Sequence, residues 1–177
     1  MVHGDTVYLT TQVWQAPGGE IYGPCTVPHS GCVSFIQTPY GRIVAPTGVC
    51  KDDYRIIDLL HRDGQTVKLQ EGALGSYKAV CEAYAKRTWP IRYRLGRVKY
   101  RPVILTGSWR SCAYQTQLYA SDPHRYAPPD VALHPRGLAV DVAMPVSDTL
   151  KAIFRRHGWK QARPDDEPWH MSYWYTG

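Results

Sequence analysis

The sequence predicts a small protein of the α+β class, and three observations support this. Before residue 50, short β-branched runs ("TVYLTTQVW", "CVSFIQT", "RIVA") are separated by Gly and Pro, which is typical of strands and turns. Residues 71–87 then change to helical spacing. Two short apolar runs near the end, "GLAVDVAMP" and "WHMSYWY", read as strands. With 177 residues, the size of one ordinary domain, we expect a β-rich N-terminal extension over 1–60 and a main domain over 61–177.

The helices are expected from periodicity and end signals. In 71–87 the apolar side chains that recur at helical spacing are Leu74, Tyr77, Val80, Cys81 and Tyr84. In "SWRSCAYQTQLYASD", Ser111 is a suitable N-cap for a short second helix. The prolines between residues 122 and 135 exclude a helix there and predict a fixed loop. A third helix, "DTLKAIFRRHGW", should end at Gly158.

After Pro90, the stretch "IRYRLGRVKYRPVILTG" alternates with a period of two and has Gly96 at a turn position, which predicts a β-hairpin. One face of this hairpin would be basic and would carry Arg92, Arg94, Arg97, Lys99 and Arg101. It is either a solvated face or a patch that attracts an anionic polymer. The formal charge of +6, from 21 Lys and Arg against 15 Asp and Glu, favours anionic partners but does not choose among nucleic acid, acidic lipid and cell wall.

The five cysteines form an odd set that cannot pair completely within one chain, so a dense disulfide framework is not expected. Cys25, His29, Cys32 and Cys50 could form a small metal site, but their spacing matches no common zinc pattern. Buried thiols, or one disulfide from Cys25 to a neighbour in this set, are the favoured reading.

No segment reaches the roughly 18 apolar residues of a membrane span, and the N-terminus lacks the basic start and apolar run of a signal peptide. We therefore expect no membrane insertion. The protein is either made in the cytosol or exported with a leader that has been removed.

Candidate metal ligands occur in "HPRGLAVD". In the strand 137–142, Asp141 shares a face with only Gly137 and Ala139, which leaves space beside the carboxylate. A buried carboxylate is costly to hold ionised without a positive partner, and a metal ion would fit that space. His134 precedes Pro135, which biases it to an extended backbone. The alternative is a loop histidine followed by a buried Asp that caps a neighbouring loop.

The closing segment "EPWHMSYWY" supplies the remaining groups. Successive side chains of this strand point to opposite faces, so both faces can be buried while His170 points inward. Two His and one Asp are the three protein ligands of a catalytic zinc site, which leaves the fourth position for water. Glu167 is the natural general base, presented on a turn because Pro168 prevents a helix. The alternative makes Glu167 a surface ion-pair partner and Trp169 a core residue.

"HPRGLAVD" followed by "EPWH" resembles the paired signatures of the zinc peptidases that include D-alanyl-D-alanine metallocarboxypeptidases and phage L-alanyl-D-glutamate endolysins. The resemblance runs from the helix near Leu74 to the end. It implies a small α+β fold with a central antiparallel sheet flanked by helices, and Zn²⁺ as cofactor. It also implies roles for particular residues: His134, Asp141 and His170 as zinc ligands, Glu167 as catalytic base, Arg110 as binder of the substrate carboxylate or the oxyanion, and Gln115 and Trp169 as substrate contacts.

One position departs from the family pattern. Where the first motif usually has a Ser two residues before the His, this chain has Ala132, so that hydroxyl contact with substrate has no counterpart here.

The function expected from these residues and this resemblance is a zinc-dependent peptidase, acting as a monomer on stem peptides of bacterial peptidoglycan. Both the D-Ala-D-Ala and the L-Ala-D-Glu bond stay open as targets. A phage endolysin, made in the host cytoplasm and released to the wall, is the expected setting. The alternative is a wall-binding module with a structural zinc, whose fourth ligand would be Cys112 or His124. Nucleic-acid binding ranks last because no recognition motif supports it.

Overall fold

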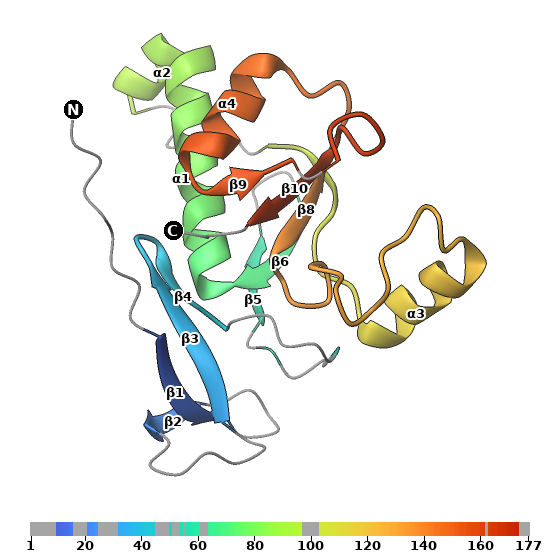
Figure 1. Ribbon diagram of the computed structural model, residues 1–177. Coiled ribbons are helices and arrows are strands. Elements are labelled where there is room, and N and C mark those ends of the chain that lie inside the picture. The colour runs from blue at the N-terminus through green and yellow to red at the C-terminus, as the bar shows by residue number, and fades with distance from the viewer. Residues whose placement is uncertain are drawn as a thin grey trace, which may run out of the picture.

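A computed structural model describes residues 10–15, 21–24, 32–44, 50, 54, 56–60, 64–96, 103–161 and 163–173 of the protein. Figure 1 shows a mixed arrangement of helices and short strands. The helices are α1 (Glu71–Thr88), α2 (Pro90–Arg94), α3 (Cys112–Ser121) and α4 (Asp148–Arg156). The strands are β1 (Thr10–Gln15), β2 (Ile21–Pro24), β3 (Cys32–Thr38), β4 (Gly41–Val44), β5 (Ile56–Leu60), β6 (Thr66–Gln70), β7 (Leu105–Gly107), β8 (Ala139–Val142), β9 (Trp159–Lys160) and β10 (His170–Tyr173).

The described strands form small antiparallel sheets. Their orders are β2-β1-β3-β4, β7-β8-β10-β9 and the two-stranded β5-β6. Every strand pair in the described part of the chain is antiparallel. The protein is therefore of the mixed α+β kind that the sequence predicts. The division into an extension and a main domain near residue 60 stays a prediction.

The buried core joins α1 and α4 to the sheet β7-β8-β10-β9. Tyr77 and Val80 of α1, Phe154 of α4, Val140 of β8 and Met171 of β10 are all fully or almost fully buried in one cluster. Helix α1 matches the helix expected over 71–87, because its apolar stripe faces this core. Figure 1 places α3 apart from α1 and α4, on the other side of β8.

Serine N-caps mark the starts of helices α3 and α4. The side chain of Ser111 accepts a hydrogen bond from the backbone N–H of Tyr114 at 3.1 Å, as predicted for the N-cap of α3. Ser147 does the same for Leu150 in α4, at 3.2 Å. No helix in the described ranges combines the length and apolar character required to cross a bilayer.

The predicted basic hairpin after Pro90 is wrong where the structure describes it. Residues 90–94 form helix α2, and Gly96 follows in a turn with φ of +65°. The reason is that proline is favoured in the first turn of a helix, where its missing N–H costs nothing. Arg92 and Arg94 therefore lie on α2, and residues 97–102 are outside the described residues.

The β5-β6 hairpin has no counterpart among the predicted elements. Its sequence signal is the Asp-Gly pair at 63–64 between two apolar runs, a strong local hairpin cue. Gln70 at the end of β6 reaches toward the later part of the chain: its side chain donates to the carbonyl of Arg136 at 2.6 Å, and its backbone N–H donates to the carbonyl of Gly137 at 3.0 Å. The hairpin thus braces the segment that leads into β8.

The structure contains a disulfide that the sequence did not suggest, while the expected pairing of Cys25 stays a prediction. Cys50 forms a disulfide with Cys112 at the start of α3, across 62 positions of sequence, and Cys81 lies buried in α1. A cross-link over a loop of this length restricts the unfolded chain strongly, which stabilises the folded state. Cys25 and His29 lie outside the described residues.

Candidate metal centre and cleft

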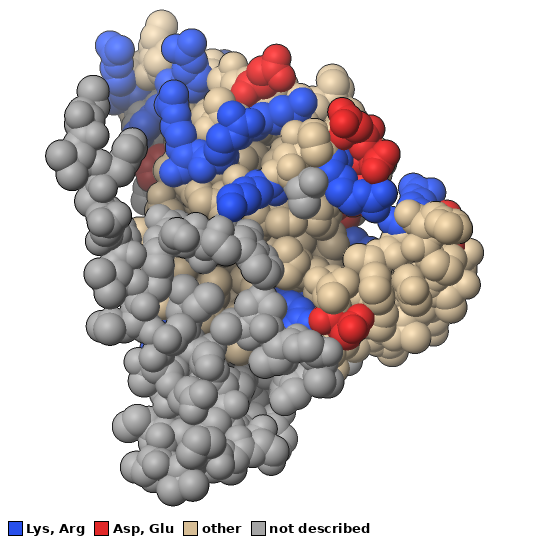
Figure 2. Space-filling model, viewed as in Figure 1, with Lys and Arg blue, Asp and Glu red and all other residues tan. Residues whose placement is uncertain are grey.

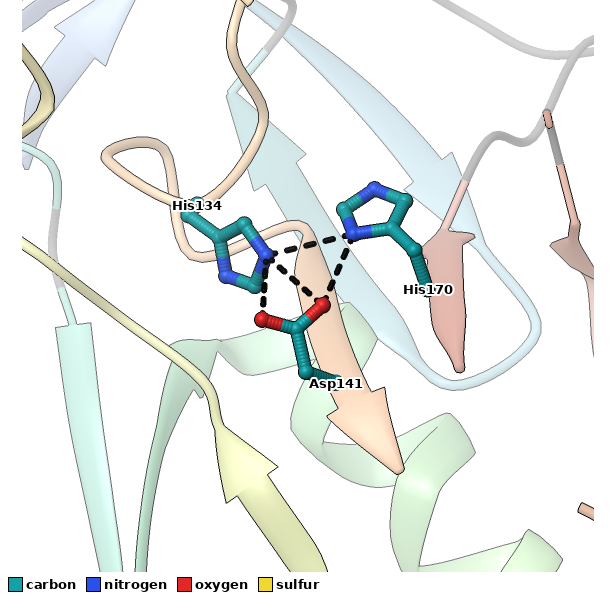
Figure 3. A group of neighbouring side chains, drawn as sticks. All are labelled: His134, Asp141 and His170. Atoms are coloured by element: carbon teal, nitrogen blue, oxygen red, sulfur yellow. Dashed lines mark hydrogen bonds and ion pairs between the residues drawn. The ribbon is translucent and has the colours of Figure 1, made fainter. Parts of the chain in front are cut away.

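The structure brings the three predicted metal ligands together. His134 comes from the turn before β8, Asp141 from β8, and His170 from the start of β10. His170 is paired directly with Asp141 in the antiparallel register, so the two side chains emerge side by side. Figure 3 shows the three side chains converging on one point. Their ligand atoms all lie within 4.8 Å of one another.

The separations between these atoms match a tetrahedral metal site. Nε2 of His134 lies 3.2 Å from Nδ1 of His170 and 3.3 Å from Oδ1 of Asp141. Nδ1 of His170 lies 3.0 Å from the same Oδ1. Zinc bonds of about 2.0–2.1 Å in a tetrahedron place neighbouring ligand atoms about 3.3 Å apart. The three side chains therefore fit zinc in donor type and spacing.

Hydrogen bonds on the far side of each ring fix which histidine nitrogen faces the site. Nδ1 of His134 donates to the backbone carbonyl of Ser108, which leaves Nε2 as the lone-pair donor. Nε2 of His170 lies 3.1 Å from Oγ of Ser172, so Nδ1 faces the cluster. Burial lowers the pKa of His134 and outweighs the opposing effect of Asp141, so its ring is neutral near pH 7 and suited to bind a metal.

Asp141 is ionised in this setting. Burial alone would raise its pKa, but hydrogen bonds and charges from His134 and His170 outweigh this and hold the pKa well below its usual range. Nη2 of Arg110 donates to Oδ2 of Asp141 at 3.1 Å. The carboxylate is thus available as a ligand at any pH at which the protein is expected to work.

The space beside Asp141 comes from the neighbouring strand. A Cβ placed on Gly107 of β7 would lie 2.9 Å from Oδ2 of Asp141, so only glycine admits the carboxylate there. Gly137, which the sequence suggested as part of this space, has another role. Its φ is +63°, and a Cβ there would meet the side chain of Ile56 at 2.5 Å and the backbone N of Gln70 at 2.9 Å.

A hydrogen-bonded turn presents Glu167 near the ligands. Its backbone N–H donates to the carbonyl of Arg163 at 2.8 Å, and its carbonyl accepts from the N–H of His170 at 3.0 Å. The side chain of Gln161 donates to the carbonyl of Pro168 at 2.5 Å. The half-buried Glu167 side chain lines the same cavity as the three ligands. The turn is therefore held at both ends before β10 begins.

This cavity is a cleft of about 800 Å³, and all seven sequence-predicted site residues line it. Arg110 extends from the loop between β7 and α3. Gln115 of α3 is 2% exposed; its Nε2 donates to the carbonyl of Ala127 at 2.7 Å, while its Oε1 has no hydrogen-bond partner among the described residues. Trp169 is half-buried, and its carbonyl accepts from the N–H of Val142 at 2.9 Å.

Neither candidate for a fourth protein ligand joins the cluster. Cys112 is held in the disulfide with Cys50, and His124 is exposed in the loop after α3. Among the described residues the group consists of His134, Asp141 and His170 alone. Three protein ligands facing an open cleft leave room for a water or substrate atom, as in catalytic zinc sites.

Sequence reasoning missed Arg136, a buried charge two residues after His134. Its side chain is almost completely buried, at 1% exposed, and has no carboxylate partner in the described part of the chain. Nε donates to the carbonyl of Ala132 at 3.2 Å, Nη1 donates to the hydroxyl of Tyr54 at 2.8 Å, and Nη2 donates to the carbonyl of Asp130. The guanidinium therefore fixes the turn that carries His134.

Replacing Arg136 with Met should lower the free energy of unfolding by about 2–4 kcal/mol, because the buried carbonyls and the Tyr54 hydroxyl would lose their donor. Urea unfolding followed by circular dichroism measures this. Arg155→Met, an exposed position on α4, is the control and should change stability little. Equal stability of parent and Arg136→Met would show that the buried guanidinium does not hold this turn.

Comparisons with known proteins give loose structural likenesses. No protein-family model matches the chain, and a search of curated proteins found no match. Solved structures that align with it include vancomycin-resistance D,D-pentapeptidase VanY with Zn(II), at 17% identity and TM-score 0.38, over 68% of this chain and 79% of VanY. DacB from Streptococcus pneumoniae D39 aligns at 21% identity and TM-score 0.40, over 85% and 86%. The LD-carboxypeptidase LdcB aligns at 16% and 0.36, over 83% of each chain. At these values the likeness assigns no family, and the geometry of the site carries the functional argument.

Proposed function

We propose that the protein is a zinc-dependent peptidase that hydrolyses bonds in the stem peptides of bacterial peptidoglycan. The observation that carries this proposal is the cluster of His134, Asp141 and His170, whose separations fit tetrahedral zinc, on an open cleft that Glu167 and Arg110 also line. The targets that the motif resemblance suggests are the D-Ala-D-Ala and L-Ala-D-Glu bonds.

In this proposal each residue has one task. When bound, zinc supplies Lewis acidity that polarises the scissile carbonyl and makes water more acidic. The Glu167 carboxylate takes the proton of the attacking water and delivers it to the leaving nitrogen. Arg110, now paired with Asp141, offers its remaining N–H groups to the developing oxyanion or to a substrate carboxylate. Gln115, which lines the buried wall of the cleft and holds the carbonyl of Ala127, and Trp169 complete the substrate-binding surface.

The disulfide supports a site of action outside the reducing cytosol. Cys50 and Cys112 join the segment before β5 to the first residue of α3, which carries Gln115. Disulfides persist mainly in oxidising surroundings such as the bacterial envelope. A phage endolysin acting on the wall after release, or an exported host enzyme, would meet such conditions.

Mass spectrometry of purified peptidoglycan digested with the zinc-loaded protein tests the proposal directly. Release of a terminal D-Ala would identify a carboxypeptidase. A new free carboxyl group on L-Ala would instead identify an endopeptidase that cuts the L-Ala-D-Glu bond. Binding to the wall with no released fragments would replace the peptidase with a binding module.

A basic face on the helices α1, α2 and α4 concerns how the enzyme reaches its substrate. Figure 2 shows Lys and Arg side chains gathered over the end of the molecule that holds α2 and α4. The last turns of α1, α2 and α4 contribute Lys86, Arg87, Arg92, Arg94, Arg155 and Arg156. Lys86, Arg87 and Arg156 line a second hollow of about 650 Å³. This face is suited to attract an anionic wall polymer.

If the basic face attracts the enzyme to the wall, added salt should reduce activity on whole cells by several-fold while changing cleavage of a short soluble peptide little, because screening weakens only the long-range attraction. Rates between 50 and 300 mM NaCl on both substrates measure this. The Arg92→Gln/Arg94→Gln double variant should show a weaker salt dependence on cells. Equal salt dependence on both substrates would make these residues an ordinary solvated face.

A further inference from the structure

Three arginines line the cleft, and two of them are already paired with carboxylates. Arg110 donates to Asp141 at 3.1 Å, and Arg163 donates to Asp166 from Nη2 at 2.8 Å and from Nε at 3.2 Å. Arg125 also lines the cleft, but it has no carboxylate partner among the residues that the structure describes. Its guanidinium lies 5.5 Å from the centre of the Tyr126 ring. Arg125 is therefore the cleft arginine whose charge is available to a ligand.

The backbone that carries Arg125 is held in a defined shape. Oδ1 of Asp122 accepts from the N–H groups of His124 and Arg125 at 3.1 and 3.2 Å, and the carbonyl of Asp122 accepts from the N–H of Tyr126 at 3.0 Å. The buried side chain of Gln115 then donates to the carbonyl of Ala127. Hydrogen bonds to Asp122 therefore hold the start of the segment 122–127, and a hydrogen bond from α3 holds its end.

Tyr126 also lines the cleft, so the guanidinium of Arg125 and the ring close to it border the same space. An arginine stacked on an aromatic ring keeps the planar fork that binds a carboxylate through two N–H groups. Because the ring limits the positions of the guanidinium, less side-chain freedom is lost when a ligand binds.

We propose that Arg125 determines specificity by binding a free carboxylate of the substrate, separate from any group that Arg110 contacts. This inference rests on the proposed peptidase function and narrows its substrate class to peptides with an unmodified acidic group near the scissile bond. In a stem peptide that group is the α-carboxyl of the γ-linked D-glutamate, which can be either free or amidated. The free form should be the better substrate.

The test uses two synthetic pentapeptides, L-Ala-γ-D-Glu-L-Lys-D-Ala-D-Ala and its D-isoglutamine counterpart, which differ only in that carboxyl. The zinc-loaded parent should cleave the acid with a kcat/KM about three- to tenfold higher than the amide, as expected for a partly exposed charge-assisted pair. Arg125→Gln should lose this preference by raising KM for the acid alone. Arg125→Lys, which keeps the charge without the fork, should fall between them. Lys78→Gln, which removes an exposed positive charge on α1, is the control and should behave as the parent.

Two results would overturn the assignment: an unchanged preference in Arg125→Gln, or an equal loss on both peptides, which would indicate a structural role. Calorimetric binding of the same peptides, measured for parent and Arg125→Gln, separates this inference from the proposed function. If the parent cleaves neither peptide, the peptidase proposal fails. Tighter binding of the acid that disappears in Arg125→Gln would still support a carboxylate site, and equal binding of both peptides would reject it.

Discussion

Glu167→Gln should reduce peptide hydrolysis by a factor of about 100 or more while leaving zinc content and thermal stability unchanged. Glutamine keeps the volume of the side chain and can still accept a hydrogen bond from water, but it cannot take a proton. The turn that presents residue 167 is held by backbone bonds to Arg163 and His170, which the substitution does not touch. Steady-state rates on the peptide that the peptidoglycan digest identifies measure the effect.

The matched control is Asp165→Asn, which removes an exposed carboxylate two positions earlier in the same segment. It should hydrolyse peptide at the parent rate. If Glu167→Gln were as fast as the parent, Glu167 would not be the base, and the cleft would need another proton acceptor.

His134→Ala and His170→Ala should each lose bound zinc, because each removes one of three protein ligands. We expect the parent to hold about one zinc per chain, and each variant to bind it at least about 100-fold more weakly and to lose hydrolysis with it. Elemental analysis after dialysis, combined with circular dichroism to confirm folding, measures the change.

His124→Ala serves as the control because His124 is exposed and lies outside the ligand group. It should keep its zinc. Full zinc occupancy in both His134→Ala and His170→Ala would rule out this cluster as the metal site, and a folded parent without zinc affinity would do the same.

The sequence was sufficient to predict features that depend on residues close together in the chain. The spacing of Leu74, Tyr77 and Val80 specifies α1, because a helix repeats its buried face every three to four residues whatever it packs against. Ser111 could be identified as an N-cap from its own short neighbourhood. The set of His134, Asp141 and His170 was predictable as well, since zinc accepts few side-chain types and the two motifs supply them.

Features that depend on contacts between distant segments required the tertiary structure. Gly107 admits the carboxylate of Asp141 from a neighbouring strand, and no spacing along the chain links the two. The Cys50–Cys112 disulfide likewise joins positions whose sequence contexts give no sign of each other.

Arg136 and Arg125 show that the surroundings of a charged side chain also depend on the tertiary structure. In the sequence both are ordinary arginines, but folding buries Arg136 against Tyr54 and two carbonyls, and it leaves Arg125 on the cleft with no carboxylate partner among the described residues. The sequence by itself determined which residues could bind a metal and where helices α1, α3 and α4 begin. Only the tertiary structure decided which charges are already neutralised and which face the cleft, because neutralisation depends on distances across the fold, and those distances are set by the packing of the whole chain.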